Sequence, residues 1–310
     1  MNRAVACRTV HGGQVIAAPS QMPFGAPQHE QLAAMTVIAM TREIGSHGSD
    51  VAAGVAAQLG LEIINSEIVM PDVAEGLGVE QGVVQRYLDG KASLFDRWQV
   101  DTRKLSRHTL DQVLNLAMKG NVLIRGWGAA ALFQGIRGIL CVRVCAPMPE
   151  RVRVMMERLG MQDGEATRRE IERFDAANSR AMRASFNFDW NDPLLYHVVL
   201  NSARVSVDAC VGAVCELALA QEQQYQDDTA TKTALADKLL ETRVRATLVE
   251  HIGSGEMAVI TLSAANGKII LEGTTSDGAL PARAAKLARE IEGVKVVDNR
   301  IVSVPSHGRF

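Results

Sequence analysis

The residues that follow a short apolar run near residue 40 are of types that could bind a phosphate group. The run Thr36 to Met40 has the composition of a buried strand, and the segment Gly45 to Ser49 contains two glycines and two serines. From Asp50 onward, apolar residues recur every four positions, which is typical of a helix. A strand, a glycine- and serine-containing loop and a helix in this order can bind phosphate, because loop amides and the helix N-terminus point at the same anion.

The loop departs from the general phosphate-loop pattern, which is G-x-x-x-x-G-K-[ST]. With Ser49 at the last position, the pattern puts Arg42 and His47 where glycines are expected and Gly48 where lysine is expected. The loop taken alone is therefore equally compatible with an ordinary tight turn between a strand and a helix.

Arginines between residues 151 and 183 form a second group of candidates. Acidic residues are interleaved with them, so one interpretation is a solvated helix face held by salt bridges. The other is a phosphate clamp, because guanidinium groups donate paired hydrogen bonds to phosphoryl oxygens. The spacing leaves both interpretations open. These arginines are Arg151, Arg153, Arg158, Arg168, Arg169, Arg173, Arg180 and Arg183.

The elements expected around these residues bring them to one edge of a sheet. Further short apolar strands are predicted at Leu61 to Ile64, Asn121 to Ile124 and Ile139 to Val144, with helices between them. Strands that alternate with helices predict an α/β fold with a parallel sheet and helices on both faces. Ligands of such folds bind at the carboxyl ends of strands, so Arg125, just after the third strand, is a candidate binding residue.

One segment interrupts this alternation, at residues 66–98. It is predicted as helical pieces separated by glycines, and a stronger helix follows at Leu105 to Met118. The segment is compatible with a mobile substrate flap and equally with a helical hairpin packed on the sheet.

Several motifs together resemble the cytidylate kinase-like family. They are, in chain order, the run Thr41 to Asp50, the helix end Ala56 to Gly60, Ala146-Pro147 with Glu150-Arg151, the run Met156 to Gly160, and the segment Asp189 to Ser202 with Asp192-Pro193 and Tyr196. The similarity covers most of a predicted first domain at 35–222. It implies a P-loop kinase-type sheet, a monophosphate-binding insert near 66–98 and an arginine-bearing lid near 158–183.

The resemblance also implies an activity, which is ATP-dependent phosphoryl transfer to a nucleoside monophosphate such as cytidylate, with Mg²⁺ as the metal ion. Gly45, Ser46, Gly48 and Ser49 match the family's phosphate loop, whereas His47 stands where the family has a glycine. All five residues are expected to hold the nucleotide phosphates, with Ser49 also next to the metal ion. Substrate binding is expected of Arg125 and, by correspondence with the helix after the fourth strand and with the lid, of Arg151 and Asp175.

Catalysis is expected to rely on arginines, because the loop has no lysine. A phosphoryl transition state needs its spread negative charge neutralised. The candidates for this role are Arg42 at the end of the first strand and the lid-side Arg158, Arg168 and Arg169.

Two further positions differ from the family's pattern. Trp127 stands where the family usually has an arginine after the third strand, and Asn178 stands where the lid often has one. Both differences remove positive charge from the predicted site. The alternative hypothesis is therefore a catalytically weak or inactive nucleotide-binding regulator that signals through the C-terminal part of the chain.

The composition changes after residue 222. Residues 223–232 are polar and predict a linker, and residues 233–305 predict two helices and three strands in the order αββαβ. This part resembles a BON domain in the run Gly267 to Gly273, the alanine-rich helix around Ala284, and the run Val297 to Ile301. The resemblance implies a small binding module with an unknown ligand or protein partner.

Composition excludes some classes of protein. The 310 residues suffice for about two domains, and 47% of them are hydrophobic. The net charge of -2 gives no broad positive surface, so no nucleic-acid partner is expected. The five cysteines form no CxxC pair, which predicts buried free thiols and fits a reducing cytoplasm.

Residues 1–34 are expected to be a disordered leader, because they contain three prolines and show no sustained period. No run approaches the roughly 20 apolar residues needed to span a membrane, so a cytoplasmic protein without a transmembrane segment is predicted. The sequence does not choose between a monomer and a homo-oligomer.

Overall fold

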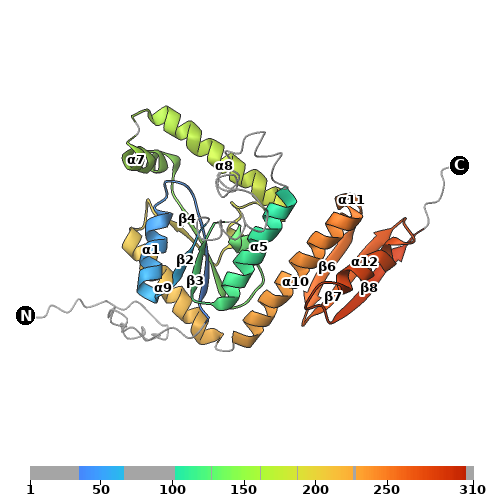
Figure 1. The fold of residues 1–310 in the computed structure, drawn as a ribbon. Helices are drawn as coiled ribbons and strands as arrows, with labels where there is room; N and C mark the ends of the chain where they lie inside the picture. Colours follow the sequence, from blue (N-terminus) through green and yellow to red (C-terminus); the bar gives the residue numbers. More distant parts are fainter. Residues whose placement is uncertain are drawn as a thin grey trace, which may run out of the picture. The chain divides into compact units, whose positions relative to one another are not determined.

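The computed structural model describes residues 35–65, 102–126, 128–160, 162–186, 188–225 and 228–304 (Figure 1). The predicted leader at 1–34, the predicted insert at 66–98 and Trp127 lie outside the described residues.

A parallel five-stranded sheet forms the centre of the first domain. Its strand order is β2-β3-β1-β4-β5, and every neighbouring pair is parallel. This confirms the α/β fold with a P-loop kinase-type sheet. The strands are β1 (Val37–Arg42), β2 (Glu62–Ile64), β3 (Val122–Arg125), β4 (Ile139–Cys145) and β5 (Val198–Asn201).

Helices cover both faces of this sheet (Figure 1). The alternation of side chains along β1 shows why both are needed, because successive residues of a strand point to opposite faces. Val37 and Ala39 pack in the core beneath α5, whereas Ile38 and Met40 pack in the core beneath α1 and α9. The covering helices are α1 (Gly48–Leu59), α5 (Thr102–Lys119), α6 (Ala129–Leu132) and α9 (Val207–Gln224).

Two helices follow β4 and pack on each other, α7 (Met148–Leu159) and α8 (Gly164–Phe186). Gly160 ends α7 in the left-handed conformation, and its N–H donates to the carbonyl of Met156. A short 3-10 turn, η1 (Pro193–Leu195), precedes β5. Helix α8 occupies most of the segment that the sequence predicts as a lid.

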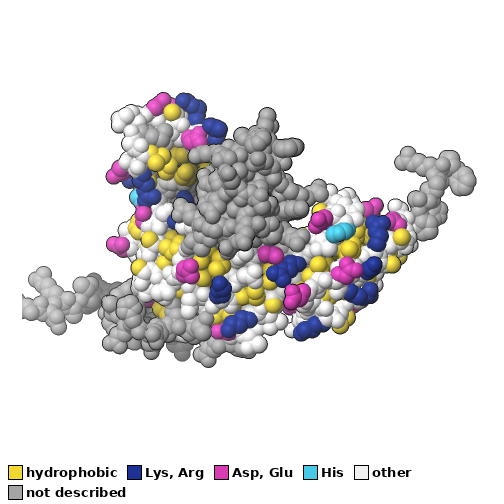
Figure 2. Space-filling model, viewed as in Figure 1, with side chains coloured by type: hydrophobic (Ala, Val, Ile, Leu, Met, Phe, Trp, Pro, Cys, Tyr) yellow, Lys and Arg dark blue, Asp and Glu magenta, His cyan; other side chains and the backbone are white. Residues whose placement is uncertain are grey.

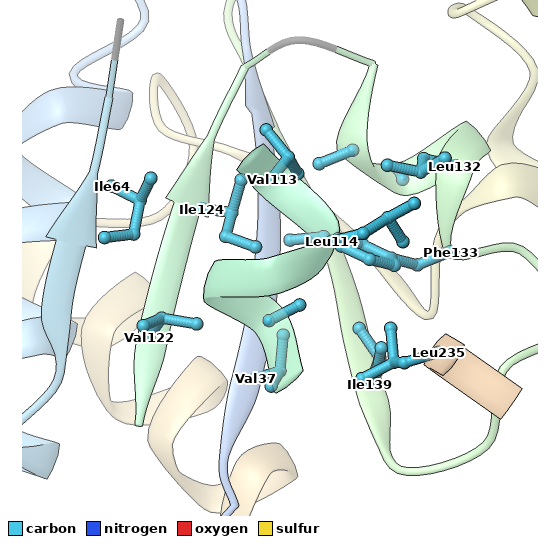
Figure 3. Close-up of a cluster of buried hydrophobic side chains, with 14 of the residues drawn as sticks. Val37, Ile64, Val113, Leu114, Val122, Ile124, Leu132, Phe133, Ile139 and Leu235 are labelled. Atoms are coloured by element: carbon cyan, nitrogen blue, oxygen red, sulfur yellow. The ribbon is translucent and has the colours of Figure 1, made fainter. Parts of the chain in front are cut away.

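Helix α10 (Asp228–Ile252) begins inside the segment predicted as a linker. Leu235 and Leu239 are buried in the core that α5 covers, and Figure 3 shows Leu235 beside Ile139. The Thr231 hydroxyl donates to the carbonyl of Arg137 at 3.0 Å. The polar residues of this segment lie mostly on exposed positions of the helix, and a few buried residues along it fix the helix to the first domain.

The second half of α10 belongs to another core, which contains Val244 and Leu248. A three-stranded sheet packs there in the order β6-β7-β8, with β6 and β7 antiparallel and β7 and β8 parallel. This confirms the αββαβ arrangement, apart from one short extra helix. The remaining elements are α11 (Ser254–Met257), β6 (Ile260–Ala265), β7 (Lys268–Thr275), α12 (Leu280–Arg289) and β8 (Val296–Ser303).

The cysteines in the described residues are free. Cys141, Cys210 and Cys215 are buried and Cys145 is half-buried. Burial raises the pKa of the Cys141 thiol to about 12. Among the described helices, none combines the length and the apolar character that crossing a membrane would need.

Candidate active site

The loop between β1 and α1 lies where two neighbouring strands connect in opposite directions. The connection through α1 runs from β1 toward the edge of the sheet formed by β2, and the connection through α7 and α8 runs from β4 toward the opposite edge, formed by β5. The N–H of Glu43 donates to the carbonyl of Val144 at 3.0 Å, which joins the loop to the end of β4. Ligands of open α/β sheets bind at such a switch point.

The backbone of the loop presents N–H groups at the start of α1. His47 precedes the helix in the left-handed conformation with φ 54°, and its carbonyl accepts from the N–H groups of Asp50 and Val51. The first N–H groups of a helix have no partner within it. Within the described residues, nothing accepts from the N–H groups of Gly48 and Ser49. These two groups are therefore oriented as an anion site requires.

Gly45 brings the loop against the start of α7. Its φ is 78°, and a Cβ atom added there would lie 2.5 Å from the carbonyl oxygen of Arg151. Both the conformation and the close approach require glycine.

The side chain of Ser46 holds the loop from within. Its buried hydroxyl lies 2.7 Å from the carbonyl of Glu43 and 3.1 Å from that of Val144, and it donates to these oxygens. Ser202 donates in turn to the carbonyl of Ser46 at 2.7 Å. The hydroxyl of Ser46 therefore shapes the loop, and its contribution to phosphate binding would come through its backbone.

Arg151 and Asp175, both predicted to bind substrate, bind each other. The two terminal nitrogens of Arg151 donate to the two carboxylate oxygens of Asp175, each at 2.8 Å. Its Nε donates to the carbonyl of Ile44 at 2.8 Å. Since this guanidinium is buried and its donors are engaged, the structure makes Arg151 a link between the loop and α8 rather than an open binding residue.

Arg42 and Arg125 lie at the carboxyl ends of neighbouring strands, β1 and β3. Burial lowers the pKa of Arg42, and the nearby charges of Arg125 and Arg158 lower it further. Neither Arg42 nor Arg125 forms an ion pair with another described residue. Three cations thus gather beside the N–H groups of the loop, where an anion would neutralise them.

Arg158 is the one member of this cluster with an acidic partner among the described residues. Its guanidinium pairs with Asp50 in the first turn of α1. The same carboxylate oxygen of Asp50 lies 2.8 Å from Nδ1 of His47. The carboxylate therefore joins the end of α7 to the loop.

Arg168 and Arg169 are not part of the cluster. Both are exposed on α8, and Arg168 pairs with Glu172 at 3.0 Å. Arg153 and Arg173 are likewise exposed and paired with acids of their own helices. For these residues the structure favours the solvated, salt-bridged face, and Figure 2 shows both signs of charge side by side over the described part of that view.

Sequence reasoning missed Arg143 and Glu43, which support the loop from below. Arg143 is buried on β4 and donates to Glu43 at 2.7 Å, and the carboxylate of Glu43 also accepts from the N–H of Ala146. The guanidinium lies 5.2 Å from the ring of Trp190 and 5.8 Å from that of Tyr196. The sequence did contain a signal for Arg143, which is an arginine inside an apolar strand. A buried charge needs a partner, so this position indicates an ion pair.

The metal prediction rests on Ser49 at the start of α1. Among the described residues, no group of three or more His, Cys, Asp or Glu side chains could hold a metal ion. Such a loop would bind magnesium mainly through the nucleotide phosphates, with one hydroxyl from the protein.

Comparison with known families and proteins agrees with this geometry. The model of the cytidylate kinase-like family matches residues 37–204, and that of the BON domain matches residues 236–305. A cytidylate kinase of Ignicoccus hospitalis is 27% identical over 189 residues, which cover 60% of this chain and 100% of the relative. A cytidylate kinase of Pyrobaculum aerophilum is 23% identical over 180 residues, covering 57% of this chain and 89% of the relative.

Two solved structures resemble the chain at low sequence identity. An uncharacterized protein from Eubacterium ventriosum is 16% identical with a TM-score of 0.45, covering 59% of this chain and 98% of its own. A shikimate kinase from Acinetobacter baumannii in complex with shikimate is 13% identical with a TM-score of 0.36, and the match covers 61% of this chain and 95% of the shikimate kinase chain.

Proposed function

The chain belongs to the cytidylate kinase-like family, and we propose that its first domain transfers a phosphoryl group from ATP to a nucleoside monophosphate, with cytidylate as the first acceptor to test. One observation carries this proposal. The N–H groups of Gly48 and Ser49 and the cations of Arg42 and Arg125 lie together at the carboxyl edge of the sheet. The relatives named cytidylate kinase support the choice of acceptor.

In this proposal the backbone of Gly45 to Ser49 receives the donor phosphates, because its amides and the start of α1 present positive charge to one anion. Ser49 would contact magnesium, which supplies charge neutralisation between donor phosphates when it is bound. Glu43 and Arg151 would position the loop without contacting the nucleotide, since they hold the loop against β4 and α7.

The arginines then divide into two groups. Arg42, Arg125 and Arg158 already lie near the loop, and they would stabilise the negative charge of the transferring group. A role for Arg168 or Arg169 stays a prediction that requires α8 to move toward the loop. Asp175 would set the position of α8 through its ion pair with Arg151.

The second candidate function is a nucleotide-binding regulator with weak or no turnover. Gly48 at the lysine position of the loop favours it, because the usual cation at the donor phosphates is missing. In this function the protein would signal through the BON domain, which would bind a ligand or a protein partner. We propose this binding role for the BON domain whether or not the first domain is a kinase.

A coupled assay with ATP and magnesium across the nucleoside monophosphates separates the two functions. A kinase should turn over at least one acceptor, and Arg158→Ala should lower its turnover by about a hundredfold if that cation meets the transferring group. Arg153→Ala on the same helix is the matched control, because Arg153 is exposed and pairs with Glu150. Nucleotide binding in calorimetry without turnover on any monophosphate would replace the kinase with the regulator.

A further inference from the structure

Gly48 and Arg42 compete for the same space. A Cβ atom added at Gly48 would lie 2.5 Å from Cβ of Arg42, 3.2 Å from its Cδ and 3.4 Å from its Cγ. Carbon atoms that are not bonded prefer about 3.5 to 4.0 Å. The aliphatic stem of Arg42 therefore fills the volume that a side chain at position 48 would need.

The backbone at position 48 does not itself require glycine. Gly48 begins α1, and its φ is not positive, unlike those of Gly45 and His47. Any L-residue could adopt this conformation without strain. Contact with Arg42 is therefore the steric reason for glycine at this position.

Position 48 is also where the phosphate-loop pattern has its lysine, whose ammonium group reaches the β- and γ-phosphates. We propose that Arg42 takes the place of this lysine and brings its cation to the donor phosphates from the end of β1, across Gly48. This inference rests on the proposed function and names the residue that meets the donor.

The surroundings of Arg42 agree with this role. Its side chain is half-buried beside two other cations, Arg125 and Arg158. Among the described residues, no acid pairs with Arg42, whereas Arg143 and Arg151 each have a carboxylate partner. A half-buried cation among like charges is stabilised by an anion, and the phosphates of a nucleotide on the loop would supply one.

The charge of Arg42 is tested with Arg42→Met, which keeps a stem over Gly48, and with Arg42→Lys, which also keeps a charge. Affinities for ATP with magnesium and for cytidine monophosphate are measured separately by calorimetry. Arg42→Met should lose about tenfold to hundredfold in ATP affinity. Arg42→Lys should lose less, and the affinity for cytidine monophosphate should stay within about twofold in both.

The steric relation is tested by exchanging the two residues. The partner of Gly48→Lys must be Arg42→Gly, because even the Cβ atom at position 42 lies 2.5 Å from a Cβ at position 48. Gly48→Lys alone should melt at a lower temperature than wild type, and the double variant Arg42→Gly, Gly48→Lys should recover part of that loss. It should also bind ATP at least about tenfold more tightly than Arg42→Gly, which would show coupling between the two sites.

Three results would overturn the inference. The first is unchanged ATP affinity in Arg42→Met, and the second is a loss confined to cytidine monophosphate, which would place Arg42 at the acceptor. The third is a double variant that melts no higher than Gly48→Lys and binds ATP no more tightly than Arg42→Gly. Wild type that binds ATP without turning over any monophosphate would refute the kinase and leave this role of Arg42 standing, whereas wild type that binds no ATP would refute both.

Discussion

Two ion pairs on α8 differ in their surroundings and therefore in their expected energies. Asp175 is 24% exposed and faces the buried guanidinium of Arg151, whereas Glu172 is 52% exposed and faces the equally exposed Arg168. Removing one partner of a buried pair leaves an uncompensated charge, but water screens an exposed pair. The exposed pair of Glu172 and Arg168 can therefore serve as the control for the pair of Asp175 and Arg151.

We expect Asp175→Asn to lower the free energy of unfolding by about 1 to 3 kcal/mol, a range reduced from that of fully buried pairs because Asp175 is partly exposed. Glu172→Gln should stay within about 0.5 kcal/mol of wild type. Urea unfolding of both variants measures the difference. Equal stability of the two variants would show that the pair with Arg151 does not hold α8 in place.

Individual residues near the loop were only partly predictable from the sequence. The types and order of Gly45 to Ser49 indicated the loop, because backbone requirements are local. The pairing of Arg151 with Asp175 was not predictable, since it joins two helices whose relative position depends on packing. Arg143 could have been noticed as a charge in an apolar strand, but its partner Glu43 could not have been identified without the register of β1 and β4.

At the scale of elements, the loop is defined by where its backbone touches α7. Gly45 and Gly60 both have positive φ, 78° and 66°. A Cβ at Gly45 would lie 2.5 Å from the carbonyl oxygen of Arg151, whereas one at Gly60 would meet nothing within 4 Å. Substitutions at these two glycines therefore distinguish the energetic cost of a strained backbone conformation, which both would have, from the cost of a steric clash, which only Gly45 would have.

We expect Gly60→Ala to cost about 1 kcal/mol in stability without a change in nucleotide affinity, because only the backbone conformation is strained. Gly45→Ala should carry the same conformational cost and also push the loop from α7, which should weaken ATP binding by about tenfold or more. Thermal melts and calorimetry measure the two effects. ATP binding that is equally strong in both variants would show that the nucleotide does not use this loop.

The sequence predicted most strands and helices of both domains, because hydrophobic periodicity reports which face of an element is buried. The start of α10 was the main difference. A polar stretch with one buried residue per turn has the composition of a linker, and only the neighbours of Thr231 and Leu235 show that it is a packed helix. Those neighbours come from α5 and from residues near 139, far away in the sequence.

At the scale of the whole molecule, α10 contributes to two hydrophobic cores. Leu235 is fully buried in the core of the first sheet, and Leu248 is fully buried in the core of the BON domain. The predicted boundary, with a linker at 223–232 and the second domain from 233, would remove Leu235 and Leu239 from the first core. We therefore propose a boundary within α10, between Leu239 and Val244.

Substitution of one leucine in each core tests this boundary. We expect Leu235→Ala to lower the stability of the first domain by about 2 to 5 kcal/mol, and Leu248→Ala to lower that of the BON domain by a similar amount, because both leave a cavity in a packed core. Thermal melts with and without ATP should identify the first domain as the transition that nucleotide raises. Leu235→Ala should lower that transition and Leu248→Ala should leave it within about 0.5 kcal/mol, since the two sites share no core. If Leu235→Ala lowers only the transition that ATP does not affect, all of α10 belongs to the C-terminal domain and the boundary returns to the one predicted from the sequence.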